Sequence, residues 1–442
     1  MRAPGGYVPT GGTGGHFASM LVVATLLFYL ITLTPFIDLT AAASADPAAE
    51  RSNTLNQVAF LALTGCLWLA AARSPARTLV ARPRGLILAL LLWFALVSAI
   101  SAHPDIALKR VMLATLTVAN AGIVLILPAS ERRFATLLGL TCLATLLLAY
   151  LGVALLPRLS IHQATEIREP MNAGLWRGHF AHKNAAAGAM VLIAFIGLYL
   201  RSTGRRLEGV AIVALAAVFL TQTGGKTASA ALPGIVGLAW IIERYPVLRA
   251  PVVLGGVAAF NILTIGCAVS GDMRAVVAAL GIDPTFTNRI DIWRIGAAAV
   301  ADRPLTGYGF QLFWQTDELV YSTGGGASWA FAAFNGHNAY LDAAVTTGLP
   351  GLALTLIWLL WLPLRDVGRA SAGGNDPALT RLFTRIWLYG VFSACVESLF
   401  FQSGSLVWFC MLIAVFGLRL QARATLVRGV EPLPNAVRPV HA

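Results

Sequence analysis

The segment FATLLGLTCLATLLLAYLGVALL, residues 134–156, carries no charged side chain and directly follows the triplet Glu131-Arg132-Arg133. A helix of about 20 apolar residues crosses the roughly 30 Å hydrocarbon core of a bilayer. Inside that core every backbone N–H and C=O group must find a hydrogen-bond partner within the protein, which a helix provides. Residues 134–156 are therefore expected to form a membrane-spanning helix.

The composition extends this expectation to the whole chain. The 442 residues are 57% hydrophobic and 12% charged, whereas soluble domains carry about 25% charged residues. So little charge cannot cover a water-facing surface, and the large apolar fraction excludes a disordered protein. Five cysteines in a chain of this length exclude a disulfide scaffold. The sequence predicts an all-α polytopic membrane protein.

Twelve apolar runs are candidates for transmembrane helices. They cover residues 17–38, 55–72, 85–101, 110–128, 134–156, 184–200, 209–223, 227–242, 251–270, 339–363, 384–400 and 403–419. The chain is expected to form one transmembrane domain over residues 17–428. A disordered cytoplasmic leader, residues 1–16, would precede this domain, and a cytoplasmic tail, residues 429–442, would follow it.

The net charge of +12 is spread along the chain rather than gathered in one patch. Proteins that bind nucleic acids cluster their basic residues, so no nucleic-acid partner is expected. Here arginines fill short gaps between the apolar runs, with an excess in every second gap. Positively charged loops are retained on the cytoplasmic side. This pattern places both termini in the cytoplasm and the two long loops, residues 157–183 and 271–337, outside.

The first outer loop ends WRGHFAHKN, residues 176–184, directly before an apolar run. Four potentially cationic side chains stand close together there: Arg177, His179, His182 and Lys183. A helix N-terminus adds partial positive charge at the same depth, so the cluster is suited to bind phosphate near the headgroups. The alternative is that Arg177 and Lys183 only hold the helix at the interface by reaching lipid phosphates.

The second outer loop contains the pattern of an amphipathic helix. Thr287-Asn288 is a candidate N-cap and Pro304 ends the pattern. Apolar residues recur between them at helical spacing: Ile290, Trp293, Ala297 and Val300. The predicted helix would lie on the membrane surface or against the bundle, with Arg289 at its start.

The same loop ends NGHNAYLD, residues 335–342, immediately before the next apolar run. His337 therefore lies at the expected boundary between water and membrane. An imidazole in this position can act as a general base. A single histidine is as often structural as catalytic, and the residues alone leave both interpretations open.

Nucleotide and metal chemistry have no support in the sequence. Gly225-Lys226-Thr227 resembles the end of a phosphate-binding loop, but Leu220 occupies the position of its first glycine. The outer loops contain no Asp-x-Asp pair and no His–carboxylate cluster at metal-ligand spacing. We therefore expect neither a metal nor another cofactor. The apolar runs hold few ionisable residues, which argues against an ion-coupled transporter.

Three stretches resemble, in order, those of bacterial O-antigen ligases and exopolysaccharide polymerases. Residues 176–184 resemble an Arg-x-x-x-Phe-x-His-Lys-Asn signature. Asn288-Arg289-Ile290-Asp291-Ile292-Trp293 with Arg303-Pro304-Leu305-Thr306-Gly307-Tyr308-Gly309 resembles Gly-Arg-x-x-Ile-Trp and Pro-x-x-Gly-x-Gly. His337-Asn338-Ala339-Tyr340-Leu341 with Gly348 and Gly351 resembles His-Asn-x-Tyr-Leu and Gly-x-x-Gly. Asn288 departs from the family, in which glycine is common.

The resemblance implies a membrane glycosyltransferase of the GT-C kind in the bacterial inner membrane, with its active site facing the periplasm. The donor would be a glycan on undecaprenyl diphosphate. The acceptor would be lipid A–core in a ligase, or another lipid-linked repeat unit in a polymerase. The residues do not decide between these two activities. A lipid-linked glycan flippase or other membrane carrier is the alternative function. Membrane lipids are the other expected partners.

Site residues follow from this chemistry, because the leaving group is a lipid diphosphate. Arg177 and Arg289 are expected to bind its oxygens, with Lys183 in support. His337 is the candidate base for the acceptor hydroxyl, in a direct and therefore inverting displacement. Four more residues are candidates for binding or orienting the substrates: His182, Asn184, Asn338 and Tyr340.

Overall fold

The computed structural model describes residues 13–31, 35–40, 54–167, 169–286, 289–321, 329–372 and 377–422. Most of the predicted leader, the predicted tail from residue 429 and the candidate N-cap Thr287-Asn288 lie outside these ranges. The described residues are helical and contain no β-strand, apart from an isolated bridge between Ile161 and Trp176. The protein is thus an all-α multi-pass membrane protein, as its sequence predicts.

Long helices build the molecule. They are α1 (Thr13–Ile31), α3 (Thr54–Arg73), α4 (Arg84–Ala99), α5 (Pro104–Ile126), α6 (Glu131–Leu155), α8 (Lys183–Ser202), α9 (Arg206–Gln222), α10 (Lys226–Arg244), α11 (Gly256–Val269), α15 (Ala339–Leu356), α16 (Leu362–Ala372), α17 (Pro377–Ser393) and α18 (Leu406–Gln421). Short helices in the loops are α7 (Pro157–Ser160), α12 (Gly271–Ala279), α13 (Arg289–Asp302) and α14 (Asp317–Val320). A π-turn, η6 (Ile357–Trp361), joins α15 to α16.

Each of the twelve predicted spans coincides with a helix or a continuous helix pair. Six helical segments of the described chain are long and apolar enough to cross a membrane: 54–73, 104–126, 131–155, 183–202, 246–269 and 339–371. Three shorter apolar helices cover 15–31, 84–99 and 406–421. The number of twelve crossings therefore stays a prediction. At the N-terminus, α1 begins at Thr13, so helix extends into residues expected to belong to the leader.

Two predicted boundaries are wrong. The first run was expected to be helical to residue 38, but α1 ends at Ile31 and the described residues 35–38 are not helical. The eleventh run was expected to be helical to residue 400, but α17 ends at Ser393 and α18 begins at Leu406. Residues 394–405, called here the α17–α18 linker, leave the helical path. Their carbonyl groups are bound by side chains and N–H groups from elsewhere in the chain, including Asn338 and Gln311. Those partners compensate for the lost helical hydrogen bonds, which is the condition for irregular backbone at membrane depth.

Arginines from the gaps that were predicted to be cytoplasmic join helix ends. Arg381 at the start of α17 contacts Glu243 at the end of α10 at 2.6 Å. Arg419 at the end of α18 contacts Asp366 in α16 at 2.7 Å, and both side chains are buried. These ion pairs bring together ends of the bundle that the sequence assigned to one side of the membrane.

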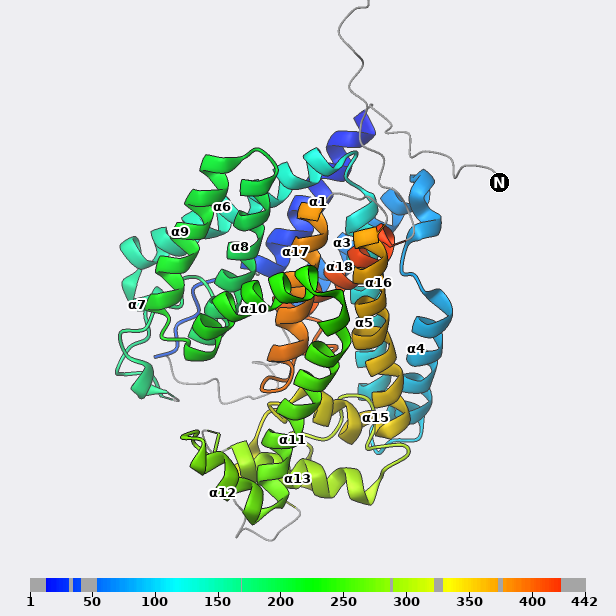
Figure 1. The fold of residues 1–442 in the computed structure, drawn as a ribbon, viewed down its shortest axis with the longest axis vertical. Helices are drawn as coiled ribbons and strands as arrows, with labels where there is room; N and C mark the ends of the chain where they lie inside the picture. The colour runs from blue at the N-terminus through cyan, green and yellow to red at the C-terminus, as the bar shows by residue number, and fades with distance from the viewer. Residues whose placement is uncertain are drawn as a thin grey trace, which may run out of the picture.

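The second long loop lies at the other end. Figure 1 shows α12 and α13 beyond the ends of the long helices, opposite the start of α1. The backbone N–H of Phe310 donates to Ser98 at the end of α4, and Arg110 near the start of α5 donates to the Gln311 carbonyl. On the same end, Ala339 N–H donates to the Ala394 carbonyl at 2.8 Å. The second loop therefore borders this end of the bundle.

Large buried aromatic residues pack the centre, next to this end. Trp358, Trp387 and Trp408 are fully buried, and the indole of Trp387 donates to the Leu359 carbonyl at 2.7 Å. The rings of Trp408 and Phe401 lie 5.0 Å apart. This packing holds the α17–α18 linker rigidly against the core, because Phe401 belongs to that linker.

Candidate functional site

Two of the predicted catalytic residues meet at a third residue, Glu397 of the α17–α18 linker. Arg289 begins α13, and its guanidinium lies 3.1 Å from Glu397 Oε1. The Nδ1 atom of His337 lies 3.6 Å from Glu397 Oε2. The side chains are partly accessible, at 22% for Arg289, 33% for His337 and 46% for Glu397. We call these three residues the Glu397 site.

Opposing influences set the charge of Glu397. Burial disfavours its ionised form, whereas the positive charge of Arg289 at 3.1 Å and the nearby imidazole of His337 favour it. Glu397 is therefore assigned as the anion that pairs with Arg289. A carboxylate thus stands between a permanent cation and a titratable base.

Asn338 and Tyr340 support the backbone around this site. Asn338 is fully buried and caps α15, because its Oδ1 accepts from the N–H groups of Tyr340 and Leu341 at 3.0 Å each. Its Nδ2 donates to the Cys395 carbonyl at 3.0 Å and to Asn261 at 2.8 Å. These four contacts use the hydrogen-bonding capacity of the amide. Tyr340 donates its hydroxyl to the Val391 carbonyl at 2.8 Å.

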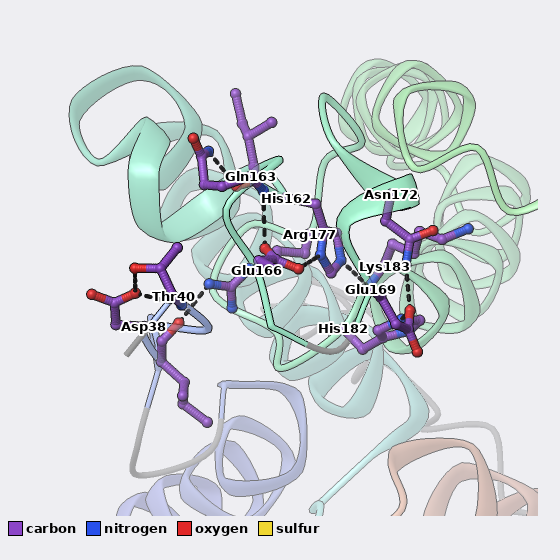
Figure 2. A network of polar contacts seen from close by, with 12 residues as sticks. Asp38, Thr40, His162, Gln163, Glu166, Glu169, Asn172, Arg177, His182 and Lys183 are labelled. Carbon is purple, nitrogen blue, oxygen red and sulfur yellow. Dashed lines mark hydrogen bonds and ion pairs between the residues drawn. The ribbon is translucent and has the colours of Figure 1, made fainter. Parts of the chain in front are cut away.

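A second polar network occupies the loop before α8 (Figure 2). Buried His162 contacts buried Glu166 at 2.7 Å, and His182 contacts Glu169 at 2.8 Å. The two imidazole rings lie 5.2 Å apart. Burial lowers the pKa of His162 more than its hydrogen bond to Glu166 raises it. The pKa of Glu169 is low because its contacts with His182 outweigh the effect of burial.

This network also occupies the N-terminus of α8. The N–H of Lys183 donates to His162 Nε2 at 3.2 Å, and the N–H of Asn184 donates to His182 Nδ1 at 3.1 Å. Two of the N–H groups that were expected to favour phosphate are therefore already capped. The side chains at this turn are more accessible. Asn184 is exposed, and the ammonium of Lys183 has no ion-pair partner among the described residues.

Arg177 lies inside the protein. Its side chain is fully buried, and it donates to the carbonyl groups of Phe180 at 3.1 Å and Ile37 at 2.5 Å. Figure 2 shows the guanidinium directed toward the segment of Asp38 and Thr40. Burial lowers its pKa, against the opposing charges of Glu166 and Asp38. The structure thus places Arg177 among backbone carbonyls and does not bring it to Arg289.

Helix packing relates the loop before α8 to the α17–α18 linker. Gly188 lies in the second turn of α8, and a Cβ atom there would stand 3.3 Å from Val407 and 3.4 Å from the hydroxyl of Tyr389. The glycine allows α8 to approach the facing ends of α17 and α18 closely. Lys183 and the Glu397 site therefore belong to neighbouring helix ends.

A long apolar cavity adjoins the Glu397 site. It has a volume of about 710 Å³ and lies between α11, α13 and the helix formed by α15 and η6. Asn261 and Tyr340 line one part of it, and Leu360 and Trp361 line another. Asn261 is also the hydrogen-bond partner of Asn338. The cavity thus leads from the residues that support the site along a membrane-spanning segment.

Comparison with known proteins shows which family part of this chain resembles. Residues 209–356 match the family model described as O-antigen ligase. The resemblance to the O-antigen ligase and polysaccharide polymerase superfamily is confirmed. The chain is also 29% identical over 215 residues to the exopolysaccharide production protein ExoQ of Rhizobium meliloti. That alignment spans 48% of this chain and 43% of the relative, so less than half of either protein is compared.

The matched region contains Arg289, His337, Asn338 and Tyr340, but it ends before Glu397. Glu397 is an ionisable residue near the end of the apolar run 384–400. An acidic side chain in such a position is itself a signal for a functional site. What the sequence did not reveal is its partners, since Arg289 and Glu397 are 108 positions apart. Among the described residues, no group of three or more potential metal ligands is present.

Proposed function

We propose that the protein is a glycosyltransferase of the O-antigen ligase and polymerase type. It transfers a glycan from undecaprenyl diphosphate to a hydroxyl of lipid A–core or of another lipid-linked repeat unit. It resides in the bacterial inner membrane with both termini in the cytoplasm, and its reaction takes place at the periplasmic face. The observation that carries this proposal is the meeting of Arg289 and His337 at Glu397.

Arg289 stabilises the leaving group in this proposal. As the bond between the sugar and the diphosphate breaks, negative charge grows on the phosphate oxygens. A guanidinium stays charged at any relevant pH and can bind two oxygens at once. Arg289 is partly exposed and is held by Glu397 and by the Val396 carbonyl, so it is oriented before the substrate arrives. No metal ion is required for this stabilisation.

Lys183 provides a second positive charge, and Arg177 acts through the loop. The Lys183 ammonium is available at the N-terminus of α8, next to exposed Asn184. Arg177 binds backbone carbonyls and thereby fixes the chain that leads to His182 and Lys183. The diphosphate role assigned to Arg177 by its sequence motif becomes, in this proposal, an indirect one.

His337 acts as the general base. Its imidazole accepts the proton of the acceptor hydroxyl, while the hydroxyl oxygen attacks the anomeric carbon and the carbon–oxygen bond to the diphosphate breaks. The proton ends on His337 and the electron pair on the leaving diphosphate. Glu397 then stabilises the imidazolium, as a carboxylate beside a catalytic histidine does. A single displacement inverts the anomeric centre.

The apolar cavity suits the lipid part of the donor. Its lining consists of aliphatic and aromatic side chains, apart from Asn261 and the tyrosine hydroxyl at the end near the site. A polyprenyl chain in this cavity would follow α15 into the membrane while its diphosphate stayed near Arg289. The relative ExoQ is described as an exopolysaccharide production protein, which is compatible with a polymerase and does not exclude a ligase.

A reconstituted assay tests the proposal. Purified protein in proteoliposomes receives an undecaprenyl-diphosphate oligosaccharide together with lipid A–core, or the donor alone, with His337→Ala as a control. Glycan joined to core identifies a ligase, and longer lipid-linked glycans from the donor alone identify a polymerase. Donor that crosses the bilayer without any glycan product would overturn the proposal in favour of a carrier.

A further inference from the structure

The backbone of His337 is held in a conformation that non-glycine residues rarely adopt. Its φ angle is +47°, in the left-handed region, where a Cβ atom is crowded by the neighbouring carbonyl. Such a conformation costs free energy and persists when surrounding contacts fix it. The contacts that fix this backbone conformation therefore also determine the direction of the His337 imidazole.

Hydrogen bonds hold the residue before His337 on both sides. The carbonyl of Gly336 accepts from the indole of Trp293 at 2.9 Å. The N–H of Gly336 donates to Asp342 Oδ1 at 3.1 Å. A Cβ atom at Gly336 would lie 2.2 Å from that same oxygen, so only glycine permits the approach. Asp342 thus directly controls the path of the chain into His337.

Asp342 also holds the partner of His337. Its other carboxylate oxygen accepts a short hydrogen bond from the hydroxyl of Ser398. Ser398 is adjacent to Glu397 in the chain. The indole of Trp314 donates to Oδ1 at 2.7 Å and completes the set of donors. One carboxylate in the first turn of α15 therefore connects the turn that carries His337 to the linker that carries Glu397.

We propose that Asp342 is a positioning residue that fixes His337 and Glu397 relative to each other. It acts through Gly336 on one side and through Ser398 on the other, and it does not contact the substrate itself. His337 Nδ1 and Glu397 Oε2 are 3.6 Å apart, so a small movement of either segment decides whether they pair. The inference rests on the proposed function of His337 as the base.

The test compares turnover and substrate binding in reconstituted protein. Asp342→Asn preserves the size of the side chain but removes one acceptor oxygen. We expect kcat to fall about tenfold to a hundredfold, since displacement of a catalytic group by about 1 Å has effects of that size. KM and the melting temperature should stay close to those of the wild type.

Two control variants separate positioning from general stabilisation. Asp291→Asn removes an exposed carboxylate that pairs with Arg294 on α13, and it should retain wild-type turnover. Trp314→Phe removes one donor to Asp342 but leaves the bonds of Asp342 to Gly336 and Ser398 in place, and it should affect kcat much less than Asp342→Asn. An equal loss of kcat in Trp314→Phe and Asp342→Asn would overturn the inference.

A double variant identifies the residue through which Asp342 acts. In a His337→Ala background, Asp342→Asn should cause no further loss of the residual rate, because the positioned group is already absent. If Asp342→Asn lowers the residual rate of His337→Ala by the same factor as it lowers the rate of the wild type, the proposal is contradicted.

If the Asp342→Asn protein does not accumulate, Ser398→Ala replaces it, since this change leaves the bonds of Asp342 to Gly336 and Trp314 intact. A several-fold fall in kcat supports the inference, and wild-type turnover overturns it.

The outcomes also separate the two proposals. Wild-type protein that forms no glycan product with either acceptor overturns the proposed function, and the positioning role falls with it. An active wild type with inactive His337→Ala and fully active Asp342→Asn overturns the positioning role alone.

Discussion

At the scale of single residues, the guanidinium of Arg289 is the group whose chemistry cannot be replaced by charge alone. It binds the Val396 carbonyl and Glu397 through different nitrogens. Lysine keeps the charge but has one compact donor group, so it cannot hold the linker and a phosphate together. Arg289→Lys should therefore lower the transfer rate by about 10²–10³-fold, as the loss of a preorganised donor does elsewhere.

The matched control for this prediction lies on the same helix. Arg294 is more exposed than Arg289 and pairs with Asp291 at 3.0 Å. Arg294→Lys should leave the rate unchanged in the same assay of glycan product. Wild-type activity in Arg289→Lys, at an equal protein level in the membrane, would remove Arg289 from the reaction.

Single residues also show that sequence patterns do not predict which candidate side chains are buried. Arg177 belongs to the same short cationic stretch as Lys183, yet Arg177 is fully buried and the side chain of Lys183 is not. The difference arises because the Arg177 guanidinium reaches the carbonyl of Ile37, which is 140 positions away. A contact between residues so far apart in the sequence produces no periodic pattern from which it could be predicted. Arg289 and His337, by contrast, were selected as candidates because each stands in a conspicuous motif beside a predicted helix.

The loop before α8 should make the protein sensitive to acid. Burial lowers the pKa of His179 to about 4, and it also lowers the pKa of His162. Both histidines are therefore favoured in their neutral forms by the fold. Their stabilising contribution is complete above the unfolded pKa of about 6.5 and is lost progressively as the pH falls toward the folded value.

Thermal unfolding at different pH values measures this effect. Between about pH 7 and about pH 5, His179 alone should account for a loss of roughly 2 kcal/mol in the free energy of unfolding. His179→Phe keeps the ring against Phe180 but cannot be protonated. Its absolute stability should fall, because the bond to the Leu30 carbonyl is lost, but its dependence on pH should become weaker. An unchanged slope would exclude His179 as a source of the effect.

At the scale of helices, the N-terminus of α15 and the α17–α18 linker depend on one amide. Asn338 caps α15 and binds the Cys395 carbonyl from a fully buried position. Loss of a cap costs about 1 kcal/mol, and the buried Cys395 carbonyl left without its partner adds about 1–3 kcal/mol. Asn338→Ala should consequently lower the free energy of unfolding by roughly 2–4 kcal/mol.

A second cap in the same molecule provides the comparison. Ser130 caps α6 through the N–H of Arg133 at 3.1 Å, in an exposed position. Ser130→Ala removes a cap and leaves no buried partner, so it should cost about 1 kcal/mol or less. Equal losses in the two variants, measured by unfolding in detergent, would show that the linker contacts of Asn338 contribute nothing.

The helices were easier to predict than the linker because apolar length is a local property. All twelve apolar runs correspond to helices, and the helix expected after Thr287-Asn288 is found as α13. Ser393 ends α17 within an otherwise apolar sequence, where composition gives no reason for a break. The break depends on Arg289, Asn338 and Tyr340, which bind the freed carbonyls from other parts of the chain. Local patterns thus define the spans, and distant partners define the site between them.

At the scale of the whole molecule, the charge pattern of the sequence and the packing of the helices agree on which end of the bundle the arginine-rich gaps occupy. Arginine-rich gaps carry the ion pairs between α10 and α17 and between α16 and α18. The loop that contains α13, which begins at Arg289, lies at the other end (Figure 1). Since lipid-linked glycans are handled by Arg289 in the proposed reaction, that end should face the periplasm.

Cysteine accessibility in intact cells tests this orientation. Four native cysteines are buried and Cys66 is partly buried, so a variant lacking all five is a suitable background. Met171→Cys lies in the loop before α8, and Asp317→Cys lies in α14 of the second long loop, both at exposed positions. Both should react with a membrane-impermeant maleimide once the reagent has access to the periplasm.

The control variant is Arg206→Cys, at the exposed start of α9. It should react only after the inner membrane is permeabilised, because the positive-inside rule retains its loop in the cytoplasm. The reverse labelling pattern would place Arg289 and His337 in the cytoplasm, on the side opposite the donor, and would exclude the proposed reaction.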